Sequence, residues 1–161
     1  MRADAATRGR ILVVEDNRLN RELVVDLLEA EGYTVIEAED GTALMERVKA
    51  EQPELILLDL QLPAVDGLTL ALQLKADPVT EGIPVLVTTA YAQVGNRERA
   101  LAAGCSGFLT KPLDVRAFVQ TVGHLLRKSS RAWAGSHAHE ATAYAGSAPR
   151  PASLPLRDNK L

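Results

Sequence analysis

The sequence is poor in aromatic side chains, cysteine and long apolar runs. Aromatic residues make up 4% of its 161 residues, and Cys105 is its single cysteine. One thiol excludes an internal disulfide and a zinc site built from several cysteines, which fits a reducing compartment. No apolar run reaches the ~20 residues that a membrane helix needs, and the run 11–14 is too short for a signal peptide. We therefore expect a cytoplasmic protein with no membrane partner.

Positive charge is also scarce. The chain has 18 basic and 21 acidic residues, a net charge of −3. This balance argues against a protein that binds nucleic acid through a basic surface. The length allows one domain with an appendage, and we expect no second effector domain of ordinary size.

The chain has two parts of different composition. Residues 1–128 carry 19 acidic and 14 basic side chains, whereas 129–161 carry two acidic and four basic ones. The second part is rich in Ala, Ser, Gly and Pro, and its prolines at 149, 151 and 155 exclude a helix over 149–155. We expect a folded domain over 9–128 and a mostly disordered tail over 129–161, which has too little apolar surface to fold.

The folded part alternates between two kinds of segment. Short apolar runs typical of buried strands lie at 11–14, 33–36, 55–58, 85–87 and 107–110. Helical patterns between and after them have apolar positions within 19–28, 43–48, 68–75, 92–103 and 115–126. The first of these helices has Leu19, Leu23, Leu27 and Leu28 on one face. Strict alternation predicts an α/β fold, a doubly wound parallel sheet covered by helices on both faces.

Polar side chains follow four of the five predicted strands. They are Glu15 and Asp16 after the first, Asp59 after the third, Thr89 after the fourth and Lys111 after the fifth. In an open α/β sheet, ligands bind beyond these carboxyl ends. Three clustered carboxylates repel one another without a cation, and hard oxygen ligands suit Mg²⁺. We predict Mg²⁺-assisted phosphoryl chemistry, with an aspartate carboxylate as the candidate nucleophile and the lysine and threonine near the phosphoryl oxygens.

These motifs resemble the receiver domain of two-component response regulators. In order along the chain they are Glu15-Asp16, Asp59, Leu62-Pro63, Asp66-Gly67, Thr89-Ala90 and Lys111-Pro112. The resemblance covers about 9–128 and implies a flavodoxin-like (βα)5 fold with strand order 2-1-3-4-5. The segment 16–20 is similar to the corresponding segment of single-domain regulators of the cell-polarity type, or of receivers attached to hybrid kinases.

The resemblance implies a phosphoacceptor and a metal site. Asp59 would accept a phosphoryl group from a kinase phosphohistidine. The Mg²⁺ ligands would be Glu15, acting mostly through a water, together with Asp16, Asp59 and the backbone carbonyl of Gln61. The metal would neutralise charge that develops during phosphoryl transfer.

The resemblance also implies a phosphate-binding set and a switch. Thr89, the Ala90 backbone N–H and Lys111 would bind phosphoryl oxygens. Thr88 competes for the threonine role, and we choose Thr89 because it directly precedes Ala90. Thr89 and Phe108 would form the switch. Phe108 stands where the family often has tyrosine, so its two states would differ by packing alone.

The function expected from this resemblance is a stand-alone response regulator. Its partners would be a sensor histidine kinase, a histidine phosphotransfer protein or both, and a downstream protein bound through the fourth helix, fifth strand and fifth helix. This output face would include Gln93, Arg97, Phe108 and 115–120, while Tyr91 and Gln61 would influence access of water to the phosphoryl group. The alternative is a phosphorelay intermediate or phosphate sink that passes phosphate to a histidine phosphotransfer protein.

Two other functions are disfavoured. A phosphatase with an aspartyl intermediate would need a cap segment for an organic substrate, and the chain shows none. We therefore expect no enzyme beyond its own phosphorylation and autodephosphorylation. A DNA-binding regulator would need a helix-turn-helix, for which the tail is too short.

Overall fold

The structure, a computed structural model, describes residues 8–63, 65–90 and 95–142, with backbone alone for 129–142. Expectations for Tyr91, Gln93 and 143–161 therefore lie outside the described residues. The elements along the chain are β1 (Arg10–Val14), α1 (Arg18–Ala30), β2 (Thr34–Ala38), α2 (Leu44–Glu51), β3 (Leu55–Asp59), α3 (Gly67–Ala76), β4 (Val85–Thr89), α4 (Asn96–Ala102), β5 (Gly107–Thr110) and α5 (Val115–Thr142). Five strands and five helices alternate, as the apolar pattern predicts.

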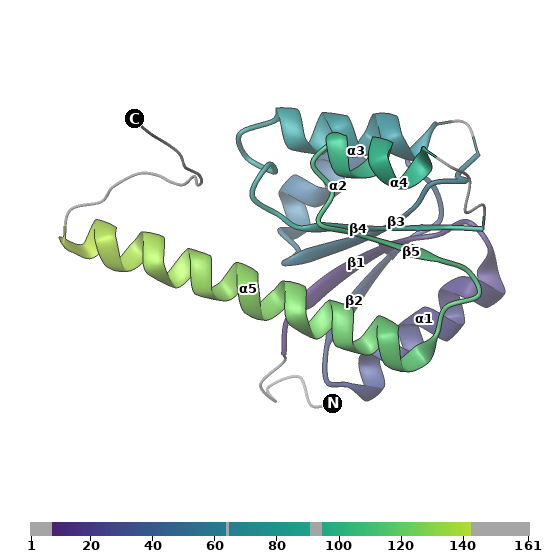
Figure 1. Cartoon of the computed structure of the whole chain (residues 1–161), viewed down its shortest axis with the longest axis horizontal. Helices are drawn as coiled ribbons and strands as arrows, with labels where there is room; N and C mark the ends of the chain where they lie inside the picture. Colours follow the sequence, from purple (N-terminus) through teal and green to yellow (C-terminus); the bar gives the residue numbers. More distant parts are fainter. Residues whose placement is uncertain (1–7, 64, 91–94, 143–161) are drawn as a thin grey trace. The chain divides into compact units, whose positions relative to one another are not determined.

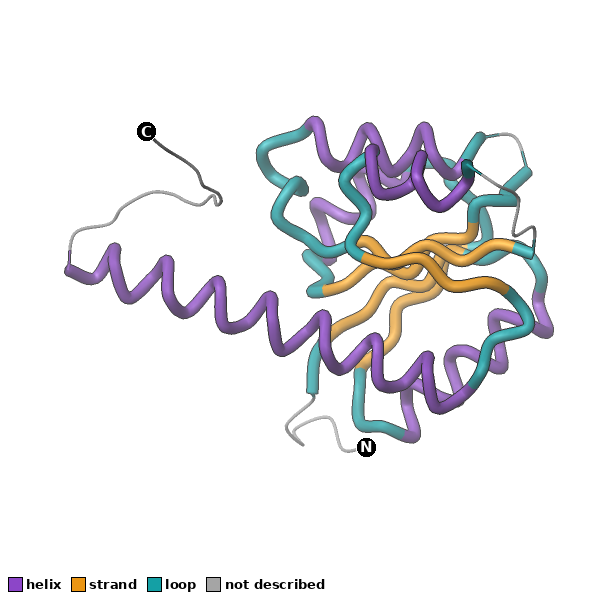
Figure 2. Tube along the Cα trace, viewed as in Figure 1, coloured by secondary structure: helices purple, strands orange, loops and turns teal. Residues whose placement is uncertain are grey.

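The strands lie side by side in one sheet (Figure 2). They are parallel and follow the order β2-β1-β3-β4-β5. This order confirms the predicted fold class and the strand order implied by the resemblance. Each pair of sequential parallel strands needs a crossover, and the helices supply it. The three inner strands β1, β3 and β4 carry residues buried on both faces, which explains their continuous apolar sequences.

Helices cover both faces of the sheet (Figure 1). On one face α2, α3 and α4 pack over a cluster that includes Leu12, Val14, Ile56, Leu58, Val85 and Val87 from the strands. On the other face α1 and the first turns of α5 pack over Ile11, Val13, Leu55, Leu57 and Leu86. Successive strand residues thus alternate between two apolar layers.

Local signals fix several helix ends. The Asn17 side chain accepts from the backbone N–H of Asn20 at 2.9 Å and begins α1. Asp114 accepts from Ala117 N at 2.9 Å in the first turn of α5. Gly104 has a φ of +98° just beyond α4, a conformation that glycine adopts without strain. These three ends are where the sequence predicts them.

Gly67 marks a close approach between α3 and β3. A Cβ atom at this position would lie 2.7 Å from the backbone oxygen of Asp59 and 2.7 Å from the Cα of Leu60. No side chain fits there, so glycine lets the start of α3 rest directly on the end of β3. The neighbouring Asp66 begins α3 by accepting from Thr69 N.

The structure corrects one prediction about α1. Leu19 and Leu23 are 75% and 53% exposed, while Val24, Val25 and Leu28 are buried. The face that packs on the sheet is therefore shifted by one residue from the predicted face, so that Val24 is buried in place of Leu23. Both stripes have helical spacing, and the position of the sheet decides between them.

Helix α5 continues to Thr142, so it extends into the segment 129–161 for which a mostly disordered tail is predicted. The prediction for 143–161 lies outside the described residues. By their internal contacts the described residues divide into two units, with the boundary between Leu126 and Arg127. Among the described residues, no helix combines the length and apolar character needed to span a membrane.

Candidate functional site

The carboxyl ends of four neighbouring strands bring the predicted site residues to one edge of the sheet. Glu15 and Asp16 follow β1, Asp59 ends β3, Thr89 ends β4 and Lys111 follows β5. These strands are consecutive in the sheet, so their ends lie side by side. The fold itself therefore gathers residues that are far apart in the sequence.

Three carboxylates form a compact group, which we call the carboxylate cluster. One oxygen from each of Glu15, Asp16 and Asp59 lies within 4.8 Å of the others. Glu15 and Asp59 are buried, whereas Asp16 is exposed. This donor set fits Mg²⁺, because it consists of hard oxygens and its exposed side leaves room for the waters that Mg²⁺ retains.

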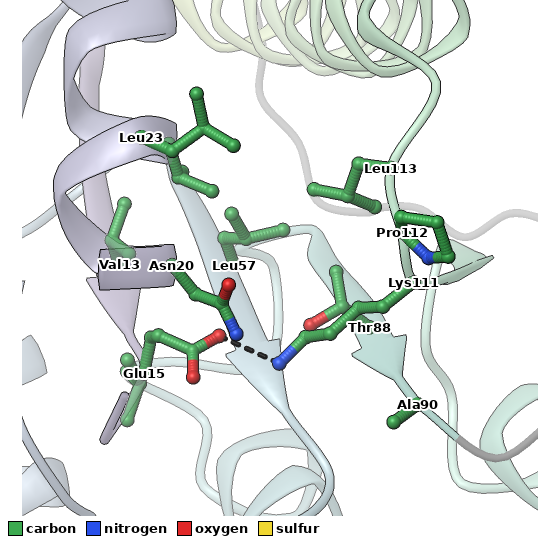
Figure 3. A pocket seen from close by; sticks show the side chains of 12 residues that line it. Val13, Glu15, Asn20, Leu23, Leu57, Thr88, Ala90, Lys111, Pro112 and Leu113 are labelled. Atoms are coloured by element: carbon green, nitrogen blue, oxygen red, sulfur yellow. Dashed lines mark hydrogen bonds and ion pairs between the residues drawn. The ribbon is translucent and has the colours of Figure 1, made fainter. Parts of the chain in front are cut away.

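Lys111 neutralises part of the carboxylate cluster. Its Nζ donates to Glu15 Oε1 at 2.8 Å and to Asp59 Oδ2 at 3.0 Å. Figure 3 shows its side chain pointing toward Glu15. Burial alone would lower the pKa of Lys111, but the hydrogen bonds to Glu15 and Asp59 together with their negative charges outweigh burial and raise that pKa. Lys111 is therefore a firmly charged ammonium beside the candidate acceptor.

The charged form of Glu15 is less well stabilised than that of Lys111. Burial raises its pKa above the ordinary value; the hydrogen bond from Lys111 offsets part of this effect, and the charge of Asp59 adds to it. A further cation at the carboxylate cluster would relieve both the burial and the repulsion. The electrostatics thus agree with the donor set in favouring metal binding.

A second, uncharged contact lies on the other side of Asp59. The side-chain amide of Gln61 donates from Nε2 to Thr89 Oγ1, and its Oε1 accepts from the backbone N–H of Ala90 at 2.8 Å. We call these two hydrogen bonds the amide bridge. The backbone N–H of Gln61 also donates to Asp59 Oδ1 at 2.9 Å. Gln61 therefore joins the candidate acceptor to both neutral groups of the predicted phosphate-binding set.

The two adjacent threonines have different surroundings. Thr89 is fully buried at the end of β4 and contacts Gln61, which lies in the β3–α3 loop. Thr88 pairs in register with Asp59 and faces a cavity on the other side of the sheet. Both hydroxyls thus lie near the carboxylate cluster, and only Thr89 takes part in the amide bridge.

Phe108 is the predicted switch residue. It lies within β5, is partly buried and packs against the apolar layer under α2, α3 and α4. The guanidinium carbon of Arg97 on α4 lies 6.0 Å from the centre of its ring. Phe108 and Arg97 therefore lie together on the predicted output face.

A cavity of about 400 Å³ opens beside Glu15 and Lys111, and no pattern in the sequence predicts it. Its walls are mostly apolar and come from β1, α1 and the segment after β5 (Figure 3). Asn20 and Leu23 of α1 face Pro112 and Leu113 across it. Leu23, an exposed leucine of α1, lines this cavity. The sequence alone could not indicate this, because the leucine pattern places Leu23 on the buried face of the helix.

Arg21 also contributes to the site, and no motif in the sequence predicts it. Its guanidinium donates from Nη1 to the backbone oxygen of Glu15 at 2.9 Å and from Nε to Glu37 Oε1 at 3.2 Å. The side chain is largely buried between the ends of β1 and β2. Arg21 therefore holds the backbone from which Glu15 and Asp16 project.

Comparison with known proteins identifies relatives over most of the chain. The family model described as the response regulator receiver domain matches residues 11–123. The polar-differentiation response regulator DivK of Brucella anthropi is 40% identical over 112 residues, which cover 70% of this chain and 91% of that protein. DivK of Brucella ovis matches over the same shares at the same identity.

Solved structures agree with this match. A response regulator structure from Chloroflexus aurantiacus superposes with a TM-score of 0.71 at 27% identity, covering 74% of this chain and 98% of that one. The receiver domain of a sensor histidine kinase from Pseudomonas aeruginosa, described with a magnesium ion coordinated in its active-site cleft, gives a TM-score of 0.69. It is 29% identical and covers 75% of this chain and 98% of its own.

Proposed function

The chain belongs to the response regulator receiver domain family, and on that premise we propose that it accepts a phosphoryl group on Asp59 from a histidine kinase. The observation that carries this proposal is the position of Asp59. It is a buried carboxylate whose Oδ2 accepts from the Lys111 ammonium and whose Oδ1 accepts from the backbone N–H of Gln61. A new group on its oxygen would meet positive charge and hydrogen-bond donors at once.

The proposed reaction is a transfer between two protein side chains. A carboxylate oxygen of Asp59 attacks the phosphorus of a kinase phosphohistidine. The P–N bond breaks as the P–O bond forms, and the imidazole leaves with its electron pair and takes up a proton. The phosphoryl group is transferred whole, so no oxidant or reductant is needed.

The residues around Asp59 have separate proposed roles. Lys111 pairs with one phosphoryl oxygen, while Thr89 and the Ala90 N–H hydrogen-bond to others. Glu15, Asp16, Asp59 and the backbone carbonyl of Gln61 would hold Mg²⁺. When bound, this ion would neutralise negative charge on the phosphoryl oxygens. Positioning and electrostatics would then supply most of the acceleration, and the protein acts on no separate substrate.

The proposed output is a phosphorylation-dependent protein contact. Thr89 and Phe108 would change together, and the face formed by α4, β5 and α5 would bind a downstream protein in one state only. Arg97 and Phe108 give this face a cation beside an aromatic ring. We place phosphoryl transfer in the cytoplasm and assign it to a receiver domain over residues 9–128. We expect no direct role for 129–161 in this reaction.

The test replaces the acceptor and a matched aspartate. Asp59→Asn should take up no phosphoryl group from acetyl phosphate with Mg²⁺, because an amide cannot form the acyl phosphate. Asp26→Asn, at an exposed position of α1, should behave like the wild type. Intact-protein mass spectrometry measures the uptake. Normal uptake by Asp59→Asn would overturn the assignment of the acceptor.

A further inference from the structure

The side chain of Gln61 occupies the groups that the proposed function reserves for a phosphoryl group. Its Nε2 donates to Thr89 Oγ1 and its Oε1 accepts from Ala90 N at 2.8 Å. Thr89 and the Ala90 N–H are the two neutral groups assigned to the phosphoryl oxygens. The amide of Gln61 thus takes the position of a hydrogen-bonding partner that is absent until Asp59 is phosphorylated.

The competition is strictest at Ala90. A backbone N–H has one hydrogen to donate, and here that hydrogen is directed at Gln61 Oε1. A phosphoryl oxygen that takes this N–H therefore has to replace Gln61 at Ala90.

The backbone around Gln61 is fixed, while its side chain is free to leave. The neighbouring Leu60 and Leu62 are buried, and Leu60 N donates to Thr88 O at 2.9 Å. The backbone N–H of Gln61 is held by Asp59 Oδ1. The side chain itself is only partly buried and bonds to an exposed amide. Release of Ala90 thus needs only rotation of the Gln61 side chain.

We propose that Gln61 acts as an internal competitor of the phosphoryl group. Its amide holds Thr89 and Ala90 together in the unphosphorylated protein, and it has to release Ala90 before a phosphoryl oxygen can bind there. This inference rests on the proposed function. It assigns to the Gln61 side chain a positioning role, distinct from the metal-binding role of its backbone carbonyl, and makes the amide bridge part of what sets the phosphorylation equilibrium.

The test uses two variants and a matched control. Gln61→Met has nearly the same length and forms neither bond, and Gln61→Asn keeps an amide that is one methylene too short to reach both groups. Gln73→Met makes the same change at an exposed position of α3. The first readout is hydrogen exchange of the Ala90 amide by NMR in the unphosphorylated, magnesium-free protein. Exchange should be about threefold to tenfold faster in both Gln61 variants, the change expected for one lost hydrogen bond.

The second readout is binding of beryllofluoride with Mg²⁺, a phosphoryl analogue that attaches to a carboxylate. Both Gln61 variants should bind it about threefold to tenfold more tightly than the wild type, because no competitor has to be displaced. Gln73→Met should match the wild type in both readouts. Equal or weaker beryllofluoride binding by the Gln61 variants would overturn the competition, as would unchanged exchange of the Ala90 amide.

Failure of the proposed function would look different. In that case the wild type and every variant alike would fail to bind beryllofluoride, and exchange of the Ala90 amide would still report whether the amide bridge forms. Failure of the competition alone would leave strong binding by the wild type and remove only the difference between it and the Gln61 variants.

Discussion

Asp59 lies between two unlike halves of one site. On one side, Lys111 and Glu15 form close charged contacts that are largely buried. On the other, Gln61, Thr89 and Ala90 are joined by neutral hydrogen bonds that reach the surface. Buried charges are costly to separate, whereas an exposed neutral hydrogen bond can be exchanged for another at little cost. The charged half is therefore suited to holding a fixed cation, and the neutral half to changing partners.

Removing the ammonium should have the largest effect on stability. Lys111→Met leaves Glu15 and Asp59 facing each other without a cation, and we expect a loss of about 3 kcal/mol in the free energy of unfolding. This lies at the low end for buried pairs, because the Lys111 side chain keeps 18% exposure. Urea denaturation without Mg²⁺ measures the loss, and added Mg²⁺ should recover part of it.

An exposed ion pair supplies the control for Lys111. Arg18 and Glu22 pair at 3.0 Å along one turn of α1, with both side chains more than half exposed. Arg18→Met should cost no more than about 0.5 kcal/mol. Equal losses in the two variants would mean that the charged half is no more than an ordinary surface pair, and the contrast between the two halves would be lost.

Comparing the two adjacent threonines tests the role of the neutral half. Thr89→Val removes a hydroxyl from the amide bridge and from the proposed phosphoryl contacts. We expect at least about tenfold weaker beryllofluoride binding, because a hydrogen bond to a charged group is lost. Thr88→Val, on the cavity side of β4, should change binding by less than about twofold. The reverse ranking would move the proposed role to Thr88.

The smallest expected effect is a pH dependence confined to the charged half. Because burial raises the pKa of Glu15 in the folded state, the unfolded state releases this proton first as the pH rises above 4.5. The contribution of Glu15 to stability should therefore decrease with rising pH until the folded state also ionises. The difference in unfolding free energy between the wild type and Glu15→Gln, measured without Mg²⁺ at several pH values, should follow this decrease. A wild type that gains stability relative to Glu15→Gln as the pH rises would contradict the raised pKa.

Much of the fold can be predicted because its signals are local. The apolar runs of the inner strands, the side chain of Asn17 at the start of α1 and Gly104 after α4 each act within a few residues. The end of α5 is less predictable. The apolar periodicity stops after residue 128, but alanine-rich sequence has helix propensity without such a pattern, and α5 continues to Thr142.

The sequence predicts which residues form the candidate site, but it does not predict all the contacts between them. The order of strand ends is enough to gather Asp59 and Lys111 at one edge, since parallel strands share their direction. The amide bridge depends on a side-chain rotamer that is selected by β4, a different part of the chain. Sequence spacing places Gln61 two residues beyond Asp59 but carries no information about that choice.

Gly67 has a consequence for the direction of movement in this site. Because α3 rests on the backbone of Asp59 and Leu60 with no side chain between them, the acceptor strand has no space in which to retreat. Asp59 is therefore the stationary point of the site. Any rearrangement that makes room for a new group falls to the atoms opposite it, at the end of β4 and in the side chains that reach toward the acceptor.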